Sequence, residues 1–210
     1  MMKEFGFVYD SSLVAPAFTN PPLWPYTLDF KIPHACVGNN HCPSRSYPGV
    51  WELVMNQIES DDVSCVYMDQ CPANLGGDDI YHTFMHNFKR HYNTNRAPLG
   101  LYFHSTWFKR QEYLDAFSKF LDYVLKLQDV YIVTNHQAIG WLKEPTAINQ
   151  LGTFQPWQCK PRHFEPHEET CVYPNSCRLH SRVLQQDRYL KTCNECPAEY
   201  PWIRNEFGLD

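Results

Sequence analysis

The sequence predicts an α/β protein whose parallel sheet or barrel is followed by a cysteine-rich tail. Over residues 78–142 the apolar pattern alternates between helix-like and strand-like periods, in the order helix, strand, helix, strand, helix. That order is typical of a parallel sheet covered by helices. After about residue 150 the periodicity fades, and five of the nine cysteines follow. We therefore predict two regions, residues 1–149 as an α/β domain and residues 150–210 as an irregular, disulfide-rich extension packing on it.

Three short strands are expected in the first third of the chain. Residues 1–5 are typical of a helix end, and residues 7–9 (FVY) of a strand. Residues 24–30 alternate apolar and polar side chains, and residues 50–55 (VWELVM) form an apolar run that suits a buried strand. Loops rich in proline and asparagine separate them.

The next two predicted elements are a helix and a strand. Ile80, Phe84 and Phe88 recur every four residues, which predicts a helix from Asp78 or Asp79 to about residue 92. Residues 99–103 are a short apolar run after a proline and predict a strand.

A long amphipathic helix is expected next, over residues 111–128. Its buried stripe consists of Leu114, Phe117, Leu121, Val124 and Leu125. Residues 130–134 (VYIVT) carry the strongest strand pattern in the sequence, and residues 136–142 predict a last helix before a proline.

The cysteines predict disulfides and an oxidising compartment. Four form two short-range pairs, and the remaining five lie in a tail with too little apolar periodicity to build its own core; they are Cys36 with Cys42, Cys65 with Cys71, and Cys159, Cys171, Cys177, Cys193 and Cys196. Small, core-poor regions of secreted proteins are commonly held by disulfides. The alternative is a zinc module built on the C-x-x-C at residues 193–196, although a structural zinc site needs a second ligand pair at regular spacing.

Composition limits the partners. The net charge is −5 and the sequence pI is about 6.0, whereas nucleic acids and anionic membranes require a basic face. The sequence contains no apolar run of the roughly 18 residues that a membrane-spanning helix needs. We therefore expect neither nucleic acid nor membrane as a partner.

One histidine occupies a position that favours chemistry. His104 follows the predicted strand at residues 99–103, and functional groups of α/β folds gather at the carboxyl ends of strands. Leu101 shares a strand face with Phe103, so Leu101 and His104 are expected to border one pocket. By itself the pattern also suits a structural histidine at a sheet edge.

Five segments of the chain form recognisable motifs: residues 9–12 (YDSS), 22–26 (PLWPY), 48–52 (PGVWE), 98–104 (PLGLYFH) and 200–210 (YPWIRNEFGLD). Together they resemble arthropod chitin deacetylases, a family of polysaccharide deacetylases. The resemblance implies a distorted (β/α) barrel that hydrolyses the N-acetyl groups of chitin with zinc or another divalent metal. On this resemblance His104 matches the acid that protonates the leaving amine, Leu101 borders the acetyl pocket, and Trp24 resembles an aromatic wall of the site.

The departures from the family pattern are as informative as the matches. The family's T-F-D-D segment, with its base and one metal ligand, and its H-[ST]-x-x-H segment, with two more ligands, should both precede residue 9. Neither is present, so we expect an incomplete barrel with no metal site and no deacetylase activity by itself. With no signal peptide at residues 1–6 and an odd cysteine count, we expect the chain to begin within a longer protein secreted to the extracellular matrix.

A second histidine pair imitates the missing motif. His82 and His86 are four residues apart on the predicted helix, a spacing that can bind zinc. They follow the YDSS segment instead of preceding it, and they flank the helix's apolar face. We therefore expect no metal there.

Two rival functions stay open at this stage. The first is a non-catalytic chitin-binding or matrix protein, in which Trp24 and Trp107 would stack on sugar rings; Trp107, just past His104, is the expected contact at the cleft rim. The second is a zinc protein built on the cysteine-rich tail.

Overall fold

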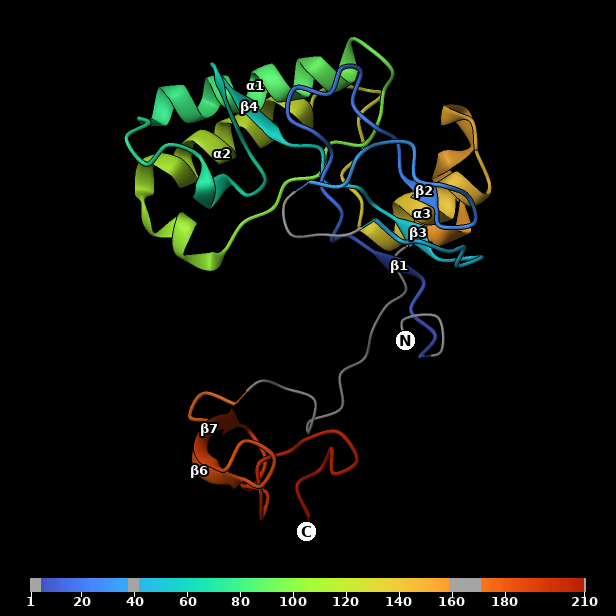
Figure 1. Ribbon diagram of the computed structural model, residues 1–210. Helices are drawn as coiled ribbons and strands as arrows, with labels where there is room; N and C mark the ends of the chain where they lie inside the picture. Colours follow the sequence, from blue (N-terminus) through green and yellow to red (C-terminus); the bar gives the residue numbers. More distant parts are fainter. Residues whose placement is uncertain (1–4, 38–41, 159–170, 210) are drawn as a thin grey trace. The chain divides into compact units, whose positions relative to one another are not determined.

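The computed structural model describes residues 5–37, 42–158 and 171–209. The chain divides into two compact units, Met1–Gln158 and Cys159–Asp210 (Figure 1). The boundary between the units falls after residue 158, whereas the sequence suggested a boundary after residue 149. The predicted packing of the tail on the first unit stays a prediction.

A small mixed sheet forms the N-terminal part of the first unit. Strand β1 (Tyr9–Asp10) pairs in parallel with β3 (Trp51–Glu52), and β2 (Tyr26–Thr27) pairs with the other edge of β3 in the antiparallel sense. Strands β2 and β3 lie inside predicted segments, and β1 overlaps the predicted strand at residues 7–9 only at Tyr9; each strand is only two residues long.

The helices follow the predicted order. They are α1 (Gly77–Tyr92), α2 (Gln111–Val124) and α3 (Asn135–Lys143). The N-cap of α1 is Gly76, two or three residues before the expected Asp78 or Asp79, and the side chain of Asp79 accepts the Gly76 backbone N–H at 2.9 Å. Helix α2 ends at residue 124 rather than 128.

The core lies where α1 packs against α2 (Figure 1). A hairpin that the sequence did not predict, β4 (Ile58–Ser60) with β5 (Val63–Cys65), packs on α1. The Phe84 side chain of α1, 1% exposed, touches aromatic rings from α2 and from the segment between the two helices. This cluster fixes the helical half of the first unit.

Two predicted strands are wrong. Residues 99–103 and residues 130–134 carry no β-ladder in the structure, although these segments had the required apolar runs. A strand needs a neighbour to satisfy its backbone, and the described residues do not supply one. The first unit is therefore a mixed α/β unit, and the distorted barrel is not confirmed.

Short 3-10 helices connect the larger elements. They are Met68–Gln70, Ser105–Lys109, Ile148–Thr153 and Gln155–Trp157. The first of them lies inside the loop that the Cys65–Cys71 disulfide closes. No helix among the described residues is long and apolar enough to cross a membrane.

The second unit is more regular than expected. Strands β6 (Asn175–Ser181) and β7 (Gln186–Thr192), each seven residues long, form an antiparallel hairpin. The Cys171–Cys193 and Cys177–Cys196 disulfides hold it, so the zinc module built on these cysteines is wrong. The predicted Cys36–Cys42 and Cys65–Cys71 pairs are confirmed. Cys159 lies outside the described residues.

Candidate active site

Segments far apart in the sequence meet beside the small sheet. The hydroxyl of Ser11 donates to the Leu53 carbonyl at 2.7 Å and shares a 2.9 Å hydrogen bond with the Tyr102 hydroxyl. The Leu13 backbone N–H donates to Oε1 of Glu52 at 3.0 Å. These bonds join the YDSS, VWE and GLYFH segments into one structure.

Glu52 is a fully buried carboxyl group at the centre of this structure. Its other oxygen, Oε2, has no hydrogen-bond partner among the described residues. Burial is the main cause that raises the pKa of Glu52 to about 7; the nearby Asp10 carboxylate acts in the same direction, and the Leu13 N–H acts against both. Burial likewise raises the pKa of Tyr102, and the proximity of Glu52 adds to the effect.

His104 directly follows residues 99–103 and lies immediately before the Ser105–Lys109 helix. Its side chain is 67% exposed. One carboxylate oxygen of Asp69, Oδ2, accepts the His104 backbone N–H at 2.9 Å and lies 3.3 Å from the imidazole Nδ1. The ring of Tyr67 lies beside the imidazole, with 5.3 Å between ring centroids.

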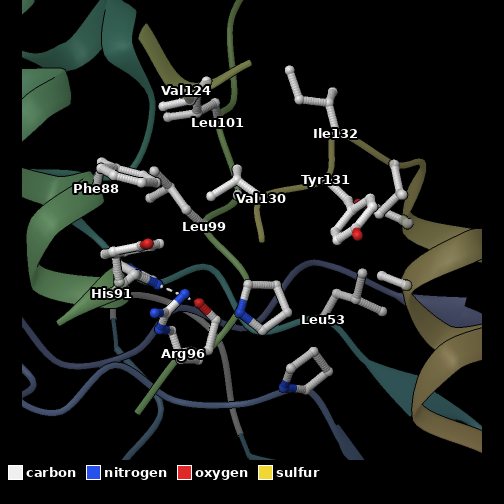
Figure 2. A pocket seen from close by; sticks show the side chains of 18 of the residues that line it. Leu53, Phe88, His91, Arg96, Leu99, Leu101, Val124, Val130, Tyr131 and Ile132 are labelled. Carbon is white, nitrogen blue, oxygen red and sulfur yellow. Dashed lines mark hydrogen bonds between the residues drawn. The ribbon is translucent and has the colours of Figure 1, made fainter. Parts of the chain in front are cut away.

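An apolar cavity of about 830 Å³ lies next to residues 99–103 and residues 130–134, which we call the first and the second extended segment (Figure 2). Leu99 and Leu101 line it from the first segment, and Val130 lines it from the second. Trp24 also lines it, but His104 is not among its lining residues. The structure therefore does not bring His104 and Leu101 to one pocket: they belong to one segment, but Leu101 lines this cavity and His104 lies outside it.

The two tryptophans proposed to bind sugar lie in different surroundings. Trp24 is half-buried, donates through Nε1 to the Asn95 carbonyl at 3.1 Å, and stacks on Trp141 at 6.3 Å. Trp107 is only 6% exposed and packs against Phe103. The expectation that Trp107 forms a cleft rim is wrong, because its ring belongs to the core around α1.

The described residues do not fit a metal site. Among residues 5–37, 42–158 and 171–209, no three His, Cys, Asp or Glu side chains are placed to hold an ion. His86 lies 3.3 Å from Oε2 of Glu59, and the ring of His82 lies beside Tyr81. The His82–His86 spacing therefore brings no third ligand with it.

The sequence did not single out Asp69, Tyr102 or the buried Glu52. Asp69 contacts His104 across 35 positions, and no spacing rule reports such a contact. One signal was available for Asp69: it lies between the paired Cys65 and Cys71, whose disulfide fixes the loop.

Comparison with known proteins supports the resemblance found in the motifs. The chain is 42% identical over 99% of its length to chitin deacetylase 1 of Bombyx mori, and 32% identical over 99% to chitin deacetylase 8 of the same species. It spans 40% and 54% of the lengths of these relatives. No protein-family model matches the chain. The prediction of a chitin deacetylase-like sequence is confirmed.

Proposed function

We propose that this chitin deacetylase-like chain supplies the general acid, His104, to a domain that removes N-acetyl groups from chitin. The observation that supports the proposal most strongly is the 42% identity to Bombyx mori chitin deacetylase 1 over 99% of the chain. It extends through the segment that carries His104 and the segments that pack around it.

The position of His104 suits an acid. Its side chain is 67% exposed, and Nδ1 faces Asp69, so Nε2 is left for a substrate. In deacetylation the oxygen of a water molecule bonds to the acetyl carbon, the amide C–N bond breaks, acetate leaves, and the sugar nitrogen gains a proton. A histidine within hydrogen-bond reach of that nitrogen performs the protonation.

The remaining catalytic groups are assigned outside the described residues. Chitin deacetylases are metal-dependent, and zinc is the metal we expect. Because the described residues do not fit a metal site, we assign the ligands and the base to the part of the domain that this chain does not span. By itself the chain is expected to release no acetate.

Secretion accompanies this function. The residues that the structure describes contain four disulfides, which form and persist in oxidising compartments. Chitin is an extracellular polymer, so a secreted protein would meet it directly.

A complementation assay tests the proposal. The chain is combined with the part of Bombyx mori chitin deacetylase 1 that lies outside the matched region, and acetate release from chitin oligosaccharides is measured with divalent metal present. We expect activity that is lost at least a hundredfold in His104→Ala, since general acid catalysis contributes roughly 10²–10⁴-fold.

The matched control is His82→Ala. His82 is also exposed, lies on α1 and is expected to leave activity unchanged. Activity that survives His104→Ala would overturn the assigned role. A complemented domain with no activity that nevertheless holds the chain on chitin beads would favour the non-catalytic chitin-binding function.

A further inference from the structure

We infer that Asp69, held in the loop that the Cys65–Cys71 disulfide closes, is the positioning residue that sets the ring orientation and tautomer of His104. The inference rests on the proposed function for its catalytic consequence. Its structural part concerns the described residues alone.

One carboxylate oxygen contacts His104 at two points. Oδ2 of Asp69 accepts the backbone N–H at 2.9 Å and lies 3.3 Å from Nδ1 of the imidazole. The first bond fixes the main chain at the end of the extended segment, and the second sets the rotation of the ring. The Asp69 side chain is 20% exposed, whereas the His104 side chain is 67% exposed.

The loop that carries Asp69 is anchored on both sides. Met68, one residue before it, is 2% exposed, and its N–H donates to the Tyr102 carbonyl at 3.1 Å. Cys65 and Cys71 are 4% and 6% exposed and are joined by the disulfide. The covalent ring therefore carries Asp69 on a buried base instead of on a free loop.

The same loop also borders His104 with an aromatic ring. Tyr67 lies 5.3 Å from the imidazole and 6.3 Å from Tyr102, measured between ring centroids. The loop thus contacts the segment of Tyr102 and His104 at three places: at the Tyr102 carbonyl, at the His104 ring and at the His104 backbone N–H. A movement of the loop would move the imidazole with it.

The chemical consequence follows from the two ring nitrogens. When Nδ1–H donates to a carboxylate, the neutral imidazole keeps its proton on Nδ1, and Nε2 is the site that gains and loses a proton. An acid that delivers its proton from Nε2 needs this arrangement. The carboxylate of the YDSS segment, Asp10, instead accepts from the Ser12 hydroxyl at 2.9 Å.

Nitrogen-15 NMR of this chain tests the inference without relying on catalysis. Long-range proton–nitrogen spectra report which nitrogen of neutral His104 carries the proton. We expect the Nδ1–H form in the natural chain and in Asp69→Asn, whose side-chain oxygen can still accept. We expect a change to the Nε2–H form in Asp69→Ala.

Two further variants separate positioning from folding. Asp62→Ala removes an exposed carboxylate from the neighbouring hairpin turn and should leave the His104 tautomer unchanged. The double variant Cys65→Ser/Cys71→Ser opens the loop while keeping Asp69, and a mixture of both tautomers is expected. Backbone amide spectra confirm that each variant is folded.

In the complemented deacetylase, Asp69→Ala should lower kcat roughly tenfold to a hundredfold with KM little changed, the range seen when an outer hydrogen-bond partner is removed. Asp69→Asn should recover much of the loss. An Nε2–H tautomer in the natural chain, or one that ignores Asp69→Ala, overturns the inference. If the tautomer responds as expected but the complemented domain releases no acetate, the proposed function fails and the positioning role stands.

Discussion

The helical side of the first unit and the side formed by its two extended segments differ in how their backbones are satisfied. Helices α1 and α2 bond their own peptide groups and bury Phe84 between them. Residues 99–103 and 130–133 have equally apolar sequences, yet they border a cavity of about 830 Å³ and form no ladder. A helix is complete within its own segment, whereas a strand is complete only when a neighbour is present.

The exposed side chains show the same difference. On the second extended segment Ile132 is 61% exposed and Tyr131 is 42% exposed, whereas Phe84 on α1 is 1% exposed. Under the proposed function, the part of the deacetylase that this chain does not span would cover this apolar side. Most of the residues that line the cavity are aliphatic or aromatic.

The largest effect is expected from truncating the centre of the helical side. Phe84→Ala removes a ring that contacts Phe103, Trp107, Phe117 and Phe120, and we expect the free energy of unfolding to fall by about 3–5 kcal/mol. Urea denaturation of the chain measures it. The matched change on the other side, Ile132→Ala, should cost no more than about 0.5 kcal/mol. Equal losses would contradict the comparison.

A smaller effect should come from the buried carboxyl beside the extended segment. Glu52 has an ordinary pKa of 4.5 and a folded pKa of about 7, so the folded chain holds its proton where the unfolded chain has lost it. Stability should therefore fall as pH rises from about 4.5 to about 7, by about 3 kcal/mol, and stay level above that range.

Glu52→Gln isolates this contribution. The variant should match the natural chain near pH 4 and exceed its stability at pH 8, as measured by thermal unfolding across pH. The comparison is needed because His91, whose pKa burial lowers to about 4, acts in the opposite sense: it weakens the fold as pH falls from 6.5 towards 4. A difference between the two proteins that does not vary with pH would refute the assignment to Glu52.

Opening the Cys65–Cys71 ring is expected to cost less. For a loop this short, the chain-entropy model gives roughly 2 kcal/mol for Cys65→Ser/Cys71→Ser, measured by urea denaturation against the natural chain. The reductant dithiothreitol should have no effect on this loop in the variant, because the variant has no Cys65–Cys71 disulfide to reduce. A loss near zero would mean that Met68 and its neighbours hold the loop without the bond.

The comparison also explains which predictions from sequence succeeded. The spacing of Ile80, Phe84 and Phe88 was sufficient for α1, because a helix and its apolar stripe are encoded locally. Residues 130–134 had a stronger β pattern than the segment of β1, but β1 forms because β3 pairs with it. Strand formation depends on a partner that the pattern of one segment does not contain.

In the candidate site, too, residues of a local motif could be found from the sequence, whereas contacts made only by the fold could not. The sequence singled out His104 and Leu101 because their motif is contiguous. Asp69 was missed because it reaches His104 only through the folded loop. Trp107 was placed at a rim because it follows His104, but the 3-10 helix that begins there turns its ring into the core.

Hydrogen exchange tests the central contrast most directly. In the chain alone, the amides of residues 99–103 and 130–133 should exchange at least a hundredfold faster than those in the middle of α1 and α2. Adding the complementary part of the deacetylase should slow the two extended segments at least tenfold and leave the helices little changed. Strong protection of these segments in the chain alone, or no change when deacetylase activity is restored, would contradict the account.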